Sequence, residues 1–318
     1  MSFYVQEPLD GGWPPLWQID DRIATRVGIH QPRGANRFEA KDGETPFDVM
    51  RRETPWFGIA GHCPFHPISL GPGQYYPRMA RPTEGVTALP RVPGFLGGGT
   101  YELSYPGLYA EWHVASMSLG RTKALSRRLA RICQTVHPAA DCREKIYGND
   151  IADLLISACM EFETQCRGIL RANSYPRPSN KCKTPDYVRL LSPLKLAEYA
   201  IGFIPFPWLS PERPFEAWDT KAPTETLPWY QAYHDVKHDR EANFSQGTLA
   251  HAFRAVSACA IIILAQYGEH WHDVEFWSYF WKGAIPSWSL TERYFQPLTE
   301  LMEDGVRRGD WTPVNYSF

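Results

Sequence analysis

Two histidines in the stretch YHDVKHDRE have a spacing that suits chemistry on a helix. His234 and His238 are four residues apart, so a helix places both rings on one face, with Glu241 one turn further. Imidazole changes charge near neutral pH, and a nearby cation such as Lys237 or Arg240 can stabilise a developing negative charge. The stretch therefore predicts either a working site or a solvated helix face with pairs such as Lys237–Glu241.

A metal ion is one possible occupant of this face. The spacing of His234 and His238 is that of HExxH, but the intervening residues are DVK, so the general-base glutamate is missing and a lysine would repel the cation. A third ligand would have to come from Glu161 or Glu163. The run HCPFH at residues 62–66 also has ligand-type residues but no matching second pair. We expect neither a bound metal nor another cofactor.

Metal-independent cleavage of RNA is a second chemistry for the same face. A histidine can deprotonate or orient the ribose 2′-hydroxyl while a cation stabilises the phosphorane charge. The run RTKALSRRLAR could track a phosphate backbone, or it could be the solvated back of a helix. The candidate RNA-binding residues are Arg121, Lys123, Arg127, Arg128, Arg131 and Lys237. In a third interpretation the polar face has no chemistry and lies at the seam of a dimer.

The bulk composition sets the context for these sites. The chain has 318 residues, 43% of them hydrophobic, and a formal charge of -2, so any nucleic-acid binding must come from a local patch. The seven cysteines include no CxxC pair, and four lie in apolar helix-like stretches, which indicates reduced thiols. No signal peptide is apparent, and the run ACAIIILAQY is too short to span a bilayer. We expect a cytoplasmic protein without membrane contact.

Residues 1–115 must adopt a different architecture from the rest of the chain. The first 110 residues hold 14 of the 28 prolines and 15 of the 24 glycines, which forbids long helices there. Short extended pieces are expected in WFGIAG, QYYPRMA and GVTALPRV, and a hairpin in TYELSY–PG–LYAEWHVASM. GFLGGGTY is expected to be a turn into that hairpin. This segment is predicted to be a small, loop-rich β segment.

Helices must position the candidate site residues within residues 116–270. RTKALSRRLARICQTV has helical apolar spacing, and the longer run whose start Asn149 or Asp150 can cap has the clearest stripe in the chain. Its members are Ile151, Leu154, Leu155, Ala158, Phe162, Cys166, Ile169 and Leu170. A further helix starts near Trp229, pauses around NFSQG and resumes from Thr248 to Tyr267. Its buried side is expected to consist of Trp229, Tyr230, Tyr233 and Val236.

Smaller elements and an aromatic-rich extension complete the predicted organisation. A short helix is expected in DYVRLL and a strand in LAEYAIGF. The extension, residues 271–318, is rich in aromatic residues, and a helix is expected in SLTERYFQPLTELMEDGV. The fold class predicted is mainly α, of the α+β type.

The helical part resembles the HEPN superfamily, on the string YHDVKH and the acidic helix that precedes it. In that family a later helix carries an arginine, a polar residue, three variable residues and a histidine. His238 falls on the family's histidine and His234 on its polar position, but Tyr233 stands where the family has arginine. Arg240 could supply the missing guanidinium, or the site is degenerate. The similarity covers roughly residues 121–267.

The resemblance implies an HEPN-like helical bundle and an RNA-directed effector of a prokaryotic stress or phage-defence system. As a toxin-like endoribonuclease it would use His238 as the acid/base, with His234 and Arg240 orienting or stabilising phosphate. Glu161 or Glu163 would position the histidines from the facing helix. RNA and a second copy of the chain, or another protein on the helical face, are the expected partners. The alternative is a non-catalytic dimerising, sensor or scaffold module on the same helices.

Overall fold

Helices and strands are both well represented in the structure, a computed structural model, and the α+β class is confirmed. The structure describes residues 2–7, 14–27, 33–54, 65–84, 106–108, 110–268, 273–297, 300–301, 307–308 and 310–318. The chain divides into two compact units. The N-terminal unit comprises Met1–Tyr75, Arg81–Glu102 and Trp288–Pro313, and the helical unit comprises Tyr76–Ala80, Leu103–Ser287 and Val314–Phe318. The predicted segments WFGIAG, GVTALPRV, GFLGGGTY and TYELSY lie outside the described residues.

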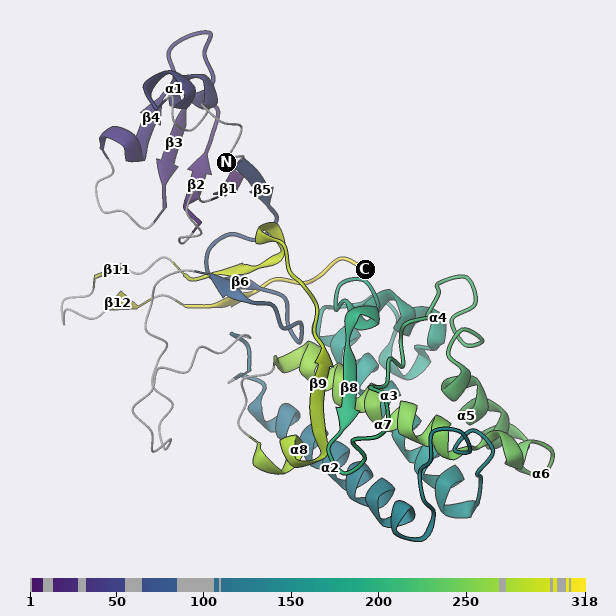
Figure 1. The fold of residues 1–318 in the computed structure, drawn as a ribbon. Coiled ribbons are helices and arrows are strands. Elements are labelled where there is room, and N and C mark those ends of the chain that lie inside the picture. The colour runs from purple at the N-terminus through teal and green to yellow at the C-terminus, as the bar shows by residue number, and fades with distance from the viewer. Residues whose placement is uncertain are drawn as a thin grey trace. The chain divides into compact units, whose positions relative to one another are not determined.

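The N-terminal unit is built on a five-stranded antiparallel sheet, in agreement with the β segment expected there (Figure 1). The strand order is β4-β3-β2-β1-β5, with β1 Ser2–Gln6, β2 Leu16–Ile19, β3 Ile23–Arg26, β4 Arg37–Glu39 and β5 Phe65–Ile68. Helix α1, Pro46–Glu53, begins at a capping box formed by Thr45 and Asp48. The core of this sheet and helix includes Trp17, Phe38, Val49 and Met50.

Short strand pairs complete the N-terminal unit. In parallel pairs, β6 Gln74–Tyr75 joins β13 Thr312–Pro313, and β7 Thr83–Glu84 joins β10 Tyr294–Phe295. Strands β11, Glu300–Leu301, and β12, Arg307–Arg308, form an antiparallel pair.

The helix expected in SLTERYFQPLTELMEDGV is wrong, because only a 3-10 turn at Leu290–Glu292 forms before β10. Pro297 disfavours helix in the residue before it, and the sheet contact with β7 buries Tyr294 and Phe295.

Four helices make the frame of the helical unit (Figure 1). They are α2 Trp112–Thr135, α3 Asn149–Ala172, α5 Pro228–His238 and α7 Leu249–Tyr267, and α7 packs against the other three. Among the described helices, α7 alone is long and apolar enough to cross a membrane, and 89% of its apolar window is buried within the fold. Burial of nearly every α7 side chain is typical of a helix at the centre of a core.

The α3 stripe predicted from the sequence is confirmed, since all eight of its members are buried. Its cap is different: Gly148 occupies the N-cap position and makes no side-chain capping bond.

The strand predicted in LYAEWHVASM, the second arm of the hairpin, is wrong, because α2 already begins at Trp112. Ala115 and Leu119 extend the buried stripe that continues through Leu125 and Leu129, so the helical period persists across this segment.

The remaining elements connect the helices. They are α4 Thr184–Tyr187, β8 Ala200–Phe203, α6 Arg240–Asn243, α8 Val274–Tyr279 and β9 Phe280–Ala284, with 3-10 turns at Ser179–Lys181, Val188–Leu190, Leu196–Glu198 and Phe244–Gln246. A further 3-10 turn, Gly34–Asn36, lies between β3 and β4 in the N-terminal unit. Strands β8 and β9 pair antiparallel, and Trp281 covers Gly202, where any side chain would collide with the indole. The strand predicted in LAEYAIGF is confirmed over Ala200–Phe203, and the short helix predicted in DYVRLL forms as the end of α4 followed by the 3-10 turn at Val188–Leu190.

Candidate functional site

Helix α5 carries the two histidines on an exposed face and is anchored on its other face. Trp229, Tyr230, Tyr233 and Val236 are all buried, as predicted, and the Trp229 indole donates to the Pro214 carbonyl at 3.0 Å. His234 and His238 are exposed, and their ring centroids lie 4.4 Å apart. A rigidly anchored helix therefore presents two neighbouring imidazoles to solvent.

The helix stops immediately after the histidine pair. Asp239 leaves the helical conformation, with φ -146° and ψ 83°, and its side chain caps α6 by accepting from the Ala242 amide at 3.1 Å. Glu241 consequently does not continue the histidine face by one turn, as the sequence predicts for an uninterrupted helix. The expected Lys237–Glu241 pair is also replaced, because Lys237 donates to the Tyr233 hydroxyl at 2.8 Å.

Arg240 is turned away toward the start of α3. Its guanidinium lies 3.4 Å from the Asp153 carboxylate, donates to the Asn149 side chain at 3.0 Å, and covers the Phe244 ring. Within the described part of the chain, none of its contacts is with a histidine. The position of Arg240 therefore corrects the expectation that it supplies the guanidinium beside His238.

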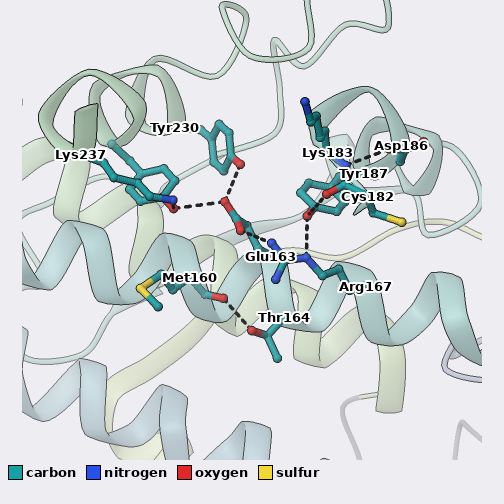
Figure 2. Close-up of polar contacts among 11 residues, drawn as sticks. Met160, Glu163, Thr164, Arg167, Cys182, Lys183, Asp186, Tyr187, Tyr230 and Lys237 are labelled. Carbon is teal, nitrogen blue, oxygen red and sulfur yellow. Dashed lines mark hydrogen bonds and ion pairs between the residues drawn. The ribbon is translucent and has the colours of Figure 1, made fainter. Parts of the chain in front are cut away.

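Glu163 is the centre of a polar cluster on the buried side of α5 (Figure 2). Its Oε1 accepts from the Tyr230 hydroxyl at 2.7 Å and from the Tyr233 hydroxyl at 3.2 Å, while its Oε2 pairs with Arg167. Glu163 thus contacts two tyrosines from α5 and not the histidines, which corrects the role expected for it.

The tyrosines around Glu163 are held in their neutral form. Burial first, and then the nearby Glu163 charge, raises the pKa of both Tyr230 and Tyr233 above the ordinary tyrosine value. Tyr187 donates to the Cys182 carbonyl at 2.8 Å and accepts from Arg167 Nε at 2.8 Å. These phenols therefore act as hydrogen-bonding groups that orient the charged side chains among them.

Glu161, two residues earlier on α3, belongs to a separate network. It accepts from Gln165 at 3.0 Å, Gln165 accepts from Gln266 at 3.0 Å, and Gln266 accepts from Arg78 at 2.8 Å. Burial raises the Glu161 pKa, and the bond from Gln165 opposes that shift. Glu161 makes no contact with His234 or His238 in the described structure, so neither glutamate has the expected positioning role.

The basic run on α2 is largely engaged by acidic partners. Lys123 lies 2.9 Å from Asp273 and 3.3 Å from Glu275, which also pairs with Arg127 at 2.8 Å. Arg128 donates to Ser157 at 3.3 Å on α3. Arg121 and Arg131 are exposed. The residues expected to track a phosphate backbone therefore include three whose side chains hold other elements of the helical unit.

The described residues contain no group of three or more His, Cys, Asp or Glu side chains that could hold a metal ion. His234 and His238 form a pair without a third ligand there. In HCPFH, residues 62–64 lie outside the described part of the chain, and His66 lies 3.7 Å from Glu7.

Arg167 and Tyr187 are site residues that the sequence reasoning missed. The i,i+4 spacing of Glu163 and Arg167 on a clear helix is a readable signal for an ion pair. The contact between Arg167 and Tyr187 had no such signal, because it depends on how the α4 turn folds against α3. Comparison with family models, curated proteins and solved structures found no significant match to this chain.

Proposed function

We propose that the chain is an RNA-directed effector of a prokaryotic stress or defence system, built on an HEPN-like helical bundle. The observation that carries the proposal is the exposed His234–His238 pair, with ring centroids 4.4 Å apart on an anchored helix. One neutral imidazole accepts the proton of a ribose 2′-hydroxyl as O2′ attacks phosphorus. The other, protonated, donates to O5′ as the P–O5′ bond breaks, which leaves a 2′,3′-cyclic phosphate.

Lys237 replaces Arg240 as the cation in this proposal. Lys237 is exposed and lies on α5 between the two histidines in sequence, three residues after His234, a spacing that makes them neighbours on a helix. Its ammonium is suited to the charge that develops on the phosphoryl oxygens. Arg240, by contrast, is engaged by Asp153 and Asn149.

The test is cleavage of total RNA in EDTA between pH 6 and 8 by wild type, His234→Ala and His238→Ala. Loss of either imidazole is expected to slow cleavage by about a hundredfold or more, because general acid–base catalysis contributes at least that much. His113→Ala is the matched control, since His113 is an exposed histidine on α2 of the same unit. RNA left intact by wild type at every pH would contradict nuclease activity, and an equal loss of cleavage in the control would contradict the catalytic role of the histidine pair.

A non-catalytic dimerising, sensor or scaffold module is the second candidate function. Tyr233 favours it, because the residue in the place of the family arginine is buried and bonded to Glu163, where it stabilises the helix pair. In that case wild type leaves RNA intact, and light scattering shows a dimer. His234→Ala with His238→Ala is then expected to weaken the dimer at least about tenfold, whereas His113→Ala leaves it unchanged.

A further inference from the structure

We infer that Lys237 and Arg167 form a phosphate subsite for single-stranded RNA, assembled on the side chain of Glu163. The inference rests on the proposed function only in taking RNA as the ligand. Figure 2 shows the two cationic side chains on either side of Glu163, one from α5 and one from α3.

The cluster has more positive than negative charge, and its two cationic side chains, Lys237 and Arg167, reach solvent. Glu163 has 13% of its side chain exposed and Arg167 has 35%, while Lys237 is an exposed residue. One carboxylate lies among two cations and two neutral phenols, Tyr230 and Tyr233. These side chains therefore carry a net charge of +1, which attracts an anion that approaches from solvent.

Lys237 has a different kind of partner from three other basic side chains of the helical unit. Lys123, Arg127 and Arg240 each pair directly with a carboxylate. The group bonded to Lys237 is instead the Tyr233 hydroxyl, and the ammonium also lies 5.0 Å from the Tyr233 ring centroid. Because a neutral phenol does not cancel the charge, Lys237 keeps both its charge and free donor capacity for a phosphate oxygen.

Buried hydroxyls fix both cations in place before a ligand binds. Tyr233 is 1% exposed, accepts from Lys237 and donates to Glu163, so it connects the ammonium to the carboxylate. Tyr187, also 1% exposed, accepts from Arg167 Nε. Tyr233 and Tyr187 are positioning residues, and prior ordering of long basic side chains lowers the entropy cost of binding.

The subsite adjoins the histidine face through α5 itself. Lys237 is three residues from His234, a spacing that makes the two side chains neighbours on a helix, and the ring centroids of His234 and His238 are 4.4 Å apart, so a phosphodiester held by Lys237 would lie within reach of the imidazole pair. Arg167 enters from α3 on the far side of Glu163 and would engage a second phosphate oxygen or the next phosphate. A guanidinium with one edge committed to Glu163 and Tyr187 still offers further N–H groups.

The experiment measures binding of a fluorescent 2′-O-methyl oligouridine, which cannot be cleaved because O2′ is blocked. Anisotropy titrations over a range of salt are made with wild type, Lys237→Met and Arg167→Met. Each variant is expected to bind about tenfold more weakly, and to reduce the slope of log affinity against log salt by about 0.7, the value for one phosphate contact on a single strand. Lys145→Met, an exposed lysine elsewhere in the helical unit, is the control.

Tyr233→Phe separates positioning from charge. The variant removes the hydroxyl that holds Lys237 but keeps the ammonium, so affinity falls while the salt slope stays at the wild-type value. Lys237→Met leaves the bonds from Tyr230, Tyr233 and Arg167 to Glu163 in place, so it tests the subsite even if Arg167→Met does not fold.

The outcomes for this subsite and for the nuclease are distinguishable. Binding by wild type that Lys237→Met weakens supports the subsite even when RNA is left uncut. Wild type that fails to bind, or Lys237→Met that binds like Lys145→Met with an unchanged salt slope, overturns the subsite even if His238→Ala abolishes cleavage.

Discussion

Glu161 and Glu163 show how two like residues on one helix acquire different roles from their partners. Glu163 is held by two phenols and a guanidinium, all of which contact its carboxylate directly. Glu161 accepts one bond from a neutral amide, and the guanidinium of Arg78 lies two glutamines further along the network. Burial is therefore better compensated for the Glu163 charge than for the Glu161 charge.

The raised pKa of Glu161 predicts a pH-dependent loss of stability. Because the folded pKa is above the unfolded value of 4.5, this group's contribution is fully present below pH 4.5 and is lost as the pH rises through the folded pKa. Glu161→Gln removes that loss. The free energy of unfolding of the variant, relative to wild type, is expected to rise between pH 4 and pH 7 in urea titrations.

Glu216→Gln is the matched control for this measurement, because it removes the same charge from an exposed position of the same unit. A difference between Glu161→Gln and wild type that stays flat or falls with pH would show that the buried carboxylate is fully compensated.

At the scale of elements, two long helices each contain an internal glycine in a different environment. Gly120 lies on α2, where an added Cβ meets no described atom within 4 Å. Gly168 lies on α3, where an added Cβ would be 2.8 Å from Cζ of Arg78 and closer still to Nη1. Arg78 is 5% exposed, so its guanidinium has little room to move away. Gly120 therefore only weakens its helix, while Gly168 leaves the space that the buried Arg78 side chain occupies.

Alanine at these two positions is expected to change stability in opposite directions. Gly120→Ala should raise the free energy of unfolding by about 0.5–1 kcal/mol, the usual gain of alanine over glycine inside a helix. Gly168→Ala should lower it by about 1–3 kcal/mol, because the methyl group overpacks the Arg78 site. Chemical denaturation of both variants checks the signs, and a stabilised Gly168→Ala would mean that Arg78 leaves its site at little cost.

Periodicity accounts for the elements that were predicted correctly and for those that were not. The α3 stripe and the buried side of α5 follow from local spacing, which both helices preserve in the folded unit. The aromatic-rich segment from Trp112 suits either a strand or a helix, and burial of Ala115 and Leu119 decides for helix. In the same way, pairing with β7 overrides the helical pattern near Tyr294.

At the scale of the whole molecule, long-range contacts set the limit of sequence reasoning about the site. The exposed histidine pair needed only the i,i+4 rule. The tyrosine partners of Glu163, by contrast, lie about 70 residues away on α5, and Arg78 meets Gln266 across a sequence separation of 188. No local pattern encodes such contacts, since they arise from the packing of α3 against α5 and α7. The residues able to do chemistry were thus predictable from the sequence, but their long-range contacts were not.

The cysteines offer a measurement of how the helical unit opens as a whole. Cys159, Cys166 and Cys259 are fully buried on α3 and α7, and burial raises the pKa of each thiol well above its ordinary value. The half-buried Cys133 and Cys142 are nearer the surface, and burial raises the pKa of Cys133 to about 11. Because the thiolate is the reactive form, the raised pKa of Cys133 slows its alkylation, and burial further restricts the three core thiols.

Alkylation by iodoacetamide at pH 8, followed by peptide mass spectrometry, is expected to modify Cys142 first among the thiols of the helical unit and Cys133 more slowly. The three core thiols should react at least about a thousandfold more slowly than Cys142, because access to them requires unfolding of a helix frame of ordinary stability. Their rates should rise with urea in parallel with the loss of helical circular dichroism. Should Cys159 or Cys259 react in buffer at a rate near that of Cys142, α3 and α7 would have to separate by local opening rather than in one cooperative transition.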